Sequence, residues 1–342
     1  MDNQRVAVLT DIGHIAVERR AIPRPGEGQV LVAVSAVSVC GSDVHYFQHG
    51  RIGDFIVGDP LVLGHEASGV VAACGPGVTE PAVGRRVAIE PQSTCGRCEQ
   101  CLRGRYNLCR QVRFFATPPV DGAFAEYVVV DAIRAHPVPD ALSDEAAALI
   151  EPLSVAVHAC EKAGVQPGSR VLISGAGPVG LLCLQVALAR GATAVTVTDI
   201  NTSRLAVAAR FGADTTVDAA EAPPSGEQHT QVDVVLECTG VAEAIAASVR
   251  RTAPAATVVL IGMGGALRLP LDLVQARELW LTGIFRYAHA YPAAIALAAS
   301  GKVALDELIT SHHDLDGVSD ALLAAGRDPA ALKAVVHPGA AV

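Results

Sequence analysis

A strand, a glycine-rich turn, a helix and a second strand follow one another between residues 170 and 199, and this order constrains the fold more than any other stretch of the chain. The turn carries Gly175, Gly177 and Gly180, and the second strand ends at Asp199. Glycines at this spacing let a pyrophosphate approach the helix N-terminus, where free N–H groups favour negative charge. The segment therefore predicts a dinucleotide-binding βαβ unit, although a doubly wound fold with an unused glycine turn would show the same order.

Asp199 indicates which dinucleotide is bound. An acidic side chain at the end of the second strand accepts hydrogen bonds from both hydroxyls of the adenosine ribose and repels a 2′-phosphate. We therefore expect NAD rather than NADP. Helices and strands continue to alternate as far as Gly262, which predicts a parallel α/β sheet, and residues 221 to 230, which include two prolines, are expected to form a loop.

The first part of the chain has a different pattern. Three strand-like runs at residues 6–9, 14–17 and 29–39 are separated by prolines and glycines, and strand patterning returns between 114 and 135, most clearly at 122–130. These runs predict a β-rich domain ahead of the α/β region. The tail from 291 to 342 reads as helix and short strand, and is expected to pack back on this first domain.

Cys40, His65 and Glu66 together predict an open zinc site. A catalytic zinc takes about three protein ligands and keeps a fourth position for water or substrate, and these residues supply a thiolate, an imidazole and a carboxylate. One thiolate and one carboxylate bring Zn²⁺ to neutrality and leave it able to polarise a hydroxyl. Cys40 by itself would more often be a small buried apolar residue.

Three further residues have two interpretations each. Ser42 and His45 could carry a proton from the metal site to water, or Ser42 could cap a short helix while His45 is solvated. Glu151 precedes a proline at the start of a predicted helix. It could be a capping carboxylate that is stabilised by the positive end of the helix dipole. Close to a metal, Glu151 would instead hold the zinc-bound water or occupy the open position.

Four cysteines form the clearest local motif of the sequence. Their spacings of two, two and seven intervening residues, in a polar loop that contains glycine, suit tetrahedral coordination of a structural zinc by Cys95, Cys98, Cys101 and Cys109. An iron–sulfur cluster is the alternative, but the last cysteine is not followed by proline and a second cluster is missing from the sequence. Either metal group would cross-link the loop and leave no open coordination position for catalysis.

Length and charge exclude several classes of protein. The 342 residues suffice for two domains, while a net charge of -9 and an aromatic content of 4% argue against binding of nucleic acid. The first residues lack the pattern of a secretory signal, and the most apolar stretch is too short to span a membrane. We expect a cytoplasmic protein without membrane contact, whose nine cysteines stay reduced.

These motifs, taken together, resemble those of the zinc-dependent medium-chain dehydrogenases, and within them the polyol (sorbitol, L-iditol or xylitol) dehydrogenases. The resemblance extends over essentially the whole chain. It rests on the following segments: Cys40-Gly-Ser-Asp-Val-His-Tyr46, Gly50-Arg-Ile-Gly-Asp-Phe55, Val62-Leu-Gly-His-Glu-Ala-Ser-Gly69, Gly104-Arg-Tyr-Asn-Leu108, Phe115-Ala-Thr-Pro-Pro119, Leu149-Ile-Glu-Pro-Leu-Ser154, Gly175-Ala-Gly-Pro178 and Phe285-Arg-Tyr287.

The resemblance implies a β-rich GroES-like catalytic domain with a Rossmann domain inserted in it, and assembly as a homotetramer. The implied limits are 1–153 for the first part of the catalytic domain, 154–285 for the NAD-binding domain and 286–342 for the return segment. Cys40, His65 and Glu66 become the ligands of the catalytic zinc, with Glu151 acting through the bound water.

The resemblance also implies contacts with the substrate and the cofactor. Tyr46, Glu151, Arg286 and Tyr287 match positions that contact the polyol, and Ser42 and His45 match the proton relay. Further positions match cofactor contacts: Val179, Asp199, Arg204, Ile261, Gly262, Met263, Ile284, Phe285 and Arg286. Phe47 and the segment 288–292 depart from the family's usual residues, and these departures bear on the length and stereochemistry of the substrate.

The function that these observations imply is oxidation of a secondary alcohol of a polyol to a ketose with NAD⁺ and zinc. One alternative is the same chemistry on a cyclitol or an amino alcohol. Another is a protein that binds NAD and zinc without catalysis, for which an open metal site would serve no purpose.

Overall fold

The computed structural model describes residues 3–221 and 231–339, and its chain forms two compact units. The first unit comprises Met1–Glu151, Ala294–Ala299 and Ala304–Val342, and the second comprises Pro152–Ala293 and Ser300–Val303. The domain limits inferred from the sequence stay a prediction. Most of the loop expected at 221–230 lies outside the described residues.

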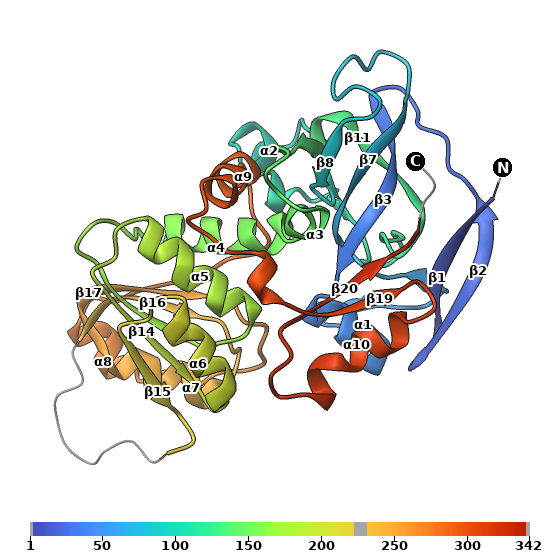
Figure 1. The fold of residues 1–342 in the computed structure, drawn as a ribbon. Helices are drawn as coiled ribbons and strands as arrows, with labels where there is room; N and C mark the ends of the chain where they lie inside the picture. Colours follow the sequence, from blue (N-terminus) through green and yellow to red (C-terminus); the bar gives the residue numbers. More distant parts are fainter. Residues whose placement is uncertain (1–2, 222–230, 340–342) are drawn as a thin grey trace. The chain divides into compact units, whose positions relative to one another are not determined.

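A seven-stranded sheet forms the centre of the first unit (Figure 1). Its order is β12-β8-β7-β3-β20-β19, and β11 also pairs with β3. The carboxyl-terminal strands therefore complete a sheet that begins near the amino terminus. The strands are β3 (Gln29–Ser38), β7 (Glu66–Cys74), β8 (Arg86–Ile89), β11 (Tyr127–Asp131), β12 (Ala135–Pro137), β19 (Ile309–Asp314) and β20 (Lys333–His337).

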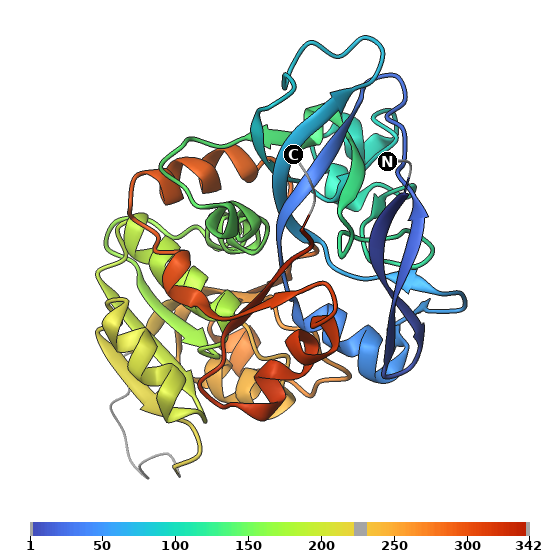
Figure 2. The same ribbon diagram turned by 45° about the vertical axis from the view of Figure 1, so that its right-hand side comes forward.

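Shorter sheets and helices surround this sheet. Strands β1 and β2 form a long antiparallel pair, which is clear in Figure 2, and β6 pairs with β1. The bounds are β1 (Asn3–Asp11), β2 (His14–Ala21), β4 (Arg51–Ile52), β5 (Phe55–Ile56), β6 (Leu61–Val62), β9 (Gln92–Ser93), β10 (Arg113–Phe114), α1 (Gly41–His49), α2 (Glu99–Leu102), α3 (Asp144–Ala148) and α10 (Val318–Arg327).

The strand expected at 122–130 is shorter than predicted. The chain forms β11 only from Tyr127, because the preceding residues bond to the segment before β7 instead of continuing a ladder. The N–H groups of Ala123 and Phe124 donate to the carbonyls of Gly64 and Leu63 at 2.7 and 3.0 Å. The ring of Phe124 is fully buried and packs against Gly64, the residue before His65.

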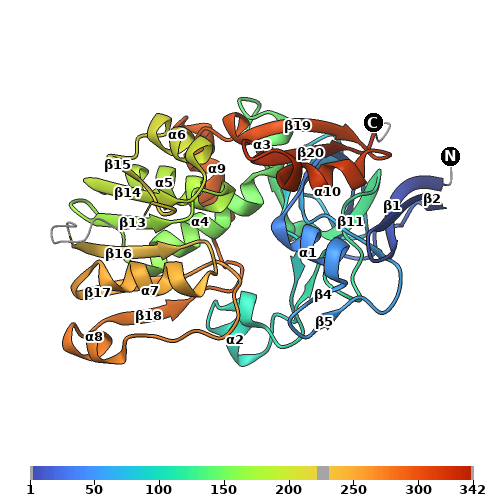
Figure 3. The same cartoon turned by 90° about the horizontal axis from the view of Figure 1, so that it is seen from below.

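The second unit contains a parallel six-stranded sheet of order β15-β14-β13-β16-β17-β18, whose strands appear in this order in Figure 3. Counted along the chain, the order is 3-2-1-4-5-6, that of a dinucleotide-binding doubly wound sheet, and it reverses between β13 and β16. The strands are β13 (Arg170–Ser174), β14 (Ala194–Asp199), β15 (Thr215–Asp218), β16 (Val232–Glu237), β17 (Thr252–Leu260) and β18 (Trp280–Gly283).

Helices connect these strands. Helix α5 is apolar on all sides and lies mostly buried, as expected of a helix enclosed by a sheet and its neighbours. In the described part of the chain, no helix is both long and apolar enough to cross a membrane. The connecting helices are α5 (Pro178–Ala189), α6 (Thr202–Arg210), α7 (Ala242–Arg250) and α8 (Leu271–Ala276). Helix α4 (Ile150–Lys162) begins in the first unit and precedes β13, and α9 (Tyr291–Ala299) follows β18 and lies mostly in the first unit.

Candidate metal and dinucleotide sites

Cys40, His65 and Glu66 meet in the first unit at the ends of two neighbouring strands. Cys40 lies just beyond β3 and caps α1, while Glu66 is the first residue of β7, which pairs with β3, and His65 immediately precedes it. One ligand atom from each residue lies within 4.8 Å of the other two. His65 and Glu66 are buried. A thiol, an imidazole and a carboxyl group at this separation fit one zinc ion and leave a coordination position open.

Asp43 orients this group, although the sequence analysis did not select it. The carboxylate of Asp43 is fully buried, and its Oδ1 lies 3.5 Å from Nδ1 of His65. It also accepts hydrogen bonds from the backbone N–H groups of Cys40 and Gly64, both at 3.0 Å. One carboxylate thus fixes both segments that carry the metal ligands. Such a partner on the second ring nitrogen is typical of histidines that bind zinc.

The pKa values of this pair follow from burial and opposite charge. Burial opposes the charge of His65, but the charges of Asp43 and Cys40 outweigh this effect and raise the pKa of the imidazole well above its ordinary value. Burial would raise the pKa of Asp43, and His65 with two backbone N–H groups lowers it. Asp43 is therefore a carboxylate acceptor that favours His65 with Nδ1 protonated, which leaves Nε2 for a metal.

Lys333 was also missed, and it neutralises Glu66. Its Nζ lies 2.7 and 2.5 Å from the two carboxylate oxygens of Glu66, and it donates to the carbonyl of Val39 at 2.9 Å. Burial lowers the pKa of Lys333, and the charges of Glu66, Cys40 and Glu151 more than reverse this, so that the pKa is raised. An ammonium group here balances the negative charge of the ligands while no metal is bound.

The other residues predicted near this site have different positions. Glu151 is buried in the first turn of α4 and acts electrostatically on Lys333, but it is not part of the 4.8 Å group. Tyr46 is buried, Ser42 is half-buried and His45 is exposed. The alternative in which Ser42 caps α1 is wrong, because Cys40 is the N-cap residue and its backbone N–H donates to the carboxylate of Asp43.

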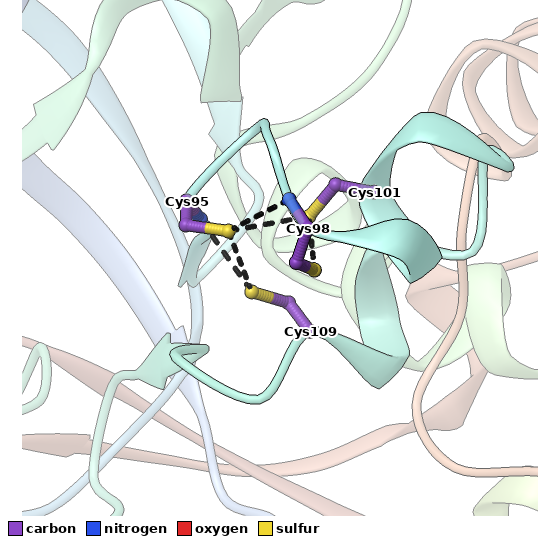
Figure 4. A group of neighbouring side chains, drawn as sticks. All are labelled: Cys95, Cys98, Cys101 and Cys109. Atoms are coloured by element: carbon purple, nitrogen blue, oxygen red, sulfur yellow. Dashed lines mark hydrogen bonds between the residues drawn. The ribbon is translucent and has the colours of Figure 1, made fainter.

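The four cysteines of the second predicted metal site converge, as Figure 4 shows. The sulfur of Cys101 lies 3.5 Å from that of Cys98 and 4.0 Å from that of Cys95, and the sulfur of Cys109 lies 3.5 Å from that of Cys95. Tetrahedral zinc with Zn–S bonds of about 2.3 Å would hold sulfurs about 3.8 Å apart. The geometry fits a closed site with four thiolates.

The surroundings of these cysteines shift the pKa values of their thiols in opposite directions. The backbone N–H of Cys101 is the main cause that lowers the pKa of Cys98 to about 6. Burial and the neighbouring sulfurs raise the pKa of Cys101 to about 11. Four thiolates in this loop therefore need a cation to balance them, which a bound zinc supplies.

The glycine turn of the second unit fits a pyrophosphate. Gly177 caps α5, and a Cβ added there would meet no atom within 4 Å, so space is open at the helix N-terminus. A Cβ on Gly180 would lie 1.9 Å from the carbonyl oxygen of Gly175, so this position requires glycine for the helix to approach the turn. Free N–H groups and open space together form a site for a phosphate group.

Asp199 ends β14 beside this turn. Its two carboxylate oxygens accept from the N–H groups of Ala176 and Asn201 at 2.6 and 2.9 Å, which fixes the side chain and leaves lone pairs for ribose hydroxyls. Arg204 lies in the first turn of α6, whose cap is Asn201. Val179 lies in the first turn of α5, and Ile261, Gly262 and Met263 follow β17.

The remaining predicted contacts follow β18. The N–H of Ile284 donates to the carbonyl of Leu260 at 3.1 Å, and the guanidinium of Arg286 lies 4.7 Å from the ring centre of Phe285. Tyr287 is fully buried beside Tyr291. The roles of these residues stay predictions.

Comparison with known proteins identifies the family. Residues 26–140 match the alcohol dehydrogenase GroES-like domain, and residues 178–300 match the zinc-binding dehydrogenase domain. A sorbitol dehydrogenase of Gallus gallus is 44% identical over 328 residues, which cover 93% of this chain and 92% of the relative. The chain belongs to the zinc-dependent medium-chain dehydrogenases.

Solved structures agree with this family. L-Idonate 5-dehydrogenase of Escherichia coli is 30% identical, with a TM-score of 0.91 and 98% of each chain covered. A structure from Sinorhizobium meliloti bound to NADP is 34% identical, with a TM-score of 0.90, and the match covers 99% of this chain and 100% of that one. This medium-chain dehydrogenase is therefore an oxidoreductase that acts on alcohols with zinc and NAD, which confirms the predicted fold class, enzyme class and cofactors.

Proposed function

We propose that this dehydrogenase oxidises a secondary alcohol of a sugar alcohol, of the sorbitol, L-iditol or xylitol type, to the ketose and reduces NAD⁺ to NADH. The observation that carries the proposal is the meeting of Cys40, His65 and Glu66 in a chain 44% identical to a sorbitol dehydrogenase. When bound, zinc would lower the pKa of the substrate hydroxyl, and a deprotonated alcohol releases hydride readily.

The chain's own residues would bind and orient the reactants. Cys40, His65 and Glu66 would hold the catalytic zinc, Asp43 would keep the lone pair of His65 directed at it, and Lys333 would balance Glu66. Glu151 would hold the water of the open position. Ser42, which is half-buried, and His45, which is exposed, would pass the alcohol proton to solvent.

Substrate and cofactor contacts are assigned from the family resemblance. Tyr46, Glu151, Arg286 and Tyr287 would contact the polyol. Asp199 would bind the adenosine ribose, which supports NAD as the cofactor. The four-cysteine loop would hold the second zinc without touching the substrate.

Zinc analysis combined with a substrate panel tests the proposal. We expect two zinc ions per chain and formation of NADH, seen at 340 nm, with sorbitol, xylitol, ribitol or L-iditol. Turnover on a cyclitol or an amino alcohol, with none on the sugar alcohols, would show that the substrate belongs to that other class. One zinc per chain and no turnover on any alcohol would favour a protein that binds NAD without catalysis.

We also propose a cytoplasmic homotetramer. In an oxidising compartment the four clustered thiols would form disulfides and could not bind zinc, so a metal site here supports a cytoplasmic location. Strand β18 lies at the edge of its sheet and carries Trp280, which is 71% exposed in the single chain, and such an edge suits contact between copies. Light scattering should give four times the chain mass of 35.2 kDa.

A further inference from the structure

A buried carboxylate lies at the carboxyl end of β16, outside every residue set described above. Glu237 is the last residue of this strand and is fully buried. Its Oε1 accepts from the N–H of Thr239 at 2.8 Å, and its two oxygens lie 3.2 and 3.1 Å from the N–H of Gly240. The hydroxyl of Thr239 also donates to it. The side chain therefore folds back and fixes the turn that follows its own strand.

Within the described residues, the recorded partners of this carboxylate are all donors of its own turn. Its charge is thus balanced by N–H and O–H groups and not by a cation. Loss of the carboxylate would leave the half-buried donors of Thr239 and Gly240 without this acceptor. The conformation of the turn therefore depends on Glu237.

This turn touches the two neighbouring loops at the same end of the sheet. A Cβ added to Gly240 would lie 2.0 Å from the carbonyl oxygen of Met263, so the turn and the segment after β17 meet backbone to backbone. On the other side, a Cβ added to Gly175 would lie 2.9 Å from Cγ2 of Thr239. The turn held by Glu237 thus lies between the phosphate-binding loop and the segment that contains Met263, and sets the distance between them.

The position of this turn in the sheet indicates which half of the cofactor it serves. The strand order reverses between β13 and β16, and dinucleotides bind across that point. The adenosine half belongs to the β14 side, where Asp199 lies, and the other half belongs to the side of β16 and β17. We propose that Glu237 is a positioning residue that shapes the wall for the nicotinamide half of NAD, an inference that rests on the proposed NAD-dependent function.

Calorimetric titration of the zinc-loaded full chain with NAD⁺ and, separately, with AMP tests this role. AMP carries only the adenosine half, so it reports on the β14 side. In Glu237→Gln, whose amide group would face N–H donors, we expect the Kd for NAD⁺ to rise about tenfold or more and the Kd for AMP to change less than twofold. The exposed Glu243→Gln on α7 is the control and should match the wild type for both ligands.

Thr239→Val keeps the methyl group beside Gly175 but removes the hydroxyl that bonds Glu237, so it tests the same turn if Glu237→Gln does not fold. It should weaken NAD⁺ binding several-fold and leave AMP binding intact. An unchanged Kd for NAD⁺ in the folded variants, or an equal loss for NAD⁺ and AMP, would overturn the positioning role. Absence of NAD⁺ binding by the wild type would overturn the proposed function, and the positioning role with it.

Discussion

At the scale of single residues, the metal site depends on side chains that are not ligands. Asp43 bonds three groups at once, namely His65 and the backbone N–H groups of Cys40 and Gly64. Because it is fully buried, it cannot exchange these partners for water. Its contribution should therefore appear in the affinity of the site for zinc rather than in the identity of the ligands.

Replacement of Asp43 by Asn should weaken zinc binding. The amide cannot supply the same negative charge to His65, and loss of such a partner typically costs about 10–100-fold in metal affinity. Competition with a chelator should show release of one zinc per chain at lower chelator concentration than in the wild type. The exposed Asp54→Asn in the same part of the chain is the control. Equal zinc retention in D43N and wild type would contradict this role.

Replacement of Lys333 by Met should destabilise the zinc-free protein by about 3 kcal/mol, because the charge of Glu66 then stays buried without a partner. Urea unfolding monitored by fluorescence measures the loss. Bound zinc should reduce the effect, since the ion also balances Glu66, and the double variant K333M/E66Q should recover most of the stability. The exposed Lys302→Met should behave as wild type, and an equal loss with and without zinc would argue against the charge explanation.

At the scale of elements, the helix inside the four-cysteine loop contributes no buried side chain, although Tyr106 and Cys109 near the end of the loop are buried. Helix α2 has only four residues, none of them buried, and Leu102 is 77% exposed. So short a helix is not stable alone in water. The loop therefore depends on the sulfurs that meet in Figure 4 and on the metal that they fit.

Replacement of Cys98 by Ser should loosen this loop without emptying the catalytic site. We expect one zinc per chain instead of two, and faster cleavage by trypsin at the exposed arginines 97, 103, 105 and 110. Mass spectrometry of the fragments locates the cuts, and Cys74→Ser, outside the cluster, is the control. Unchanged cleavage with one zinc lost would show that the metal does not hold the loop.

At the scale of the whole molecule, the metal ligands and the dinucleotide turn belong to different compact units. Cys40, His65 and Glu66 lie in the first unit, and Gly177 and Asp199 lie in the second. Each site is built from contacts inside its own unit. Damage to one site should therefore leave binding at the other intact.

Replacement of His65 by Ala tests this independence. Turnover should fall by about a hundredfold or more, because polarisation by the metal is worth several kcal/mol and each 1.36 kcal/mol is a factor of ten in rate. The Kd for NAD⁺, measured by calorimetry, should stay within about threefold of the wild type. Near wild-type turnover in zinc-free H65A would refute the mechanism, while loss of NAD⁺ binding would refute the independence of the two sites.

The sequence by itself determined the features that depend on residues close together in the chain. The glycine turn with its flanking strands, the cysteine spacing and the His65-Glu66 pair are local patterns, and each constrains a backbone turn or a ligand set without help from the rest of the fold. They predicted the dinucleotide-binding sheet and two groups of possible zinc ligands, and the described structure contains both.

Only the tertiary structure decided the partners that hold these sites. Lys333 reaches Glu66 across 267 residues of sequence because β20 joins the sheet beside β3, and no local pattern predicts that pairing. Asp43 both caps a helix and contacts His65, and the side chain of Glu237 folds back on its own turn. These roles depend on where each side chain points, which the periodicity of the sequence does not predict. A buried charge must find its partner in space, and the fold determines which residue lies there.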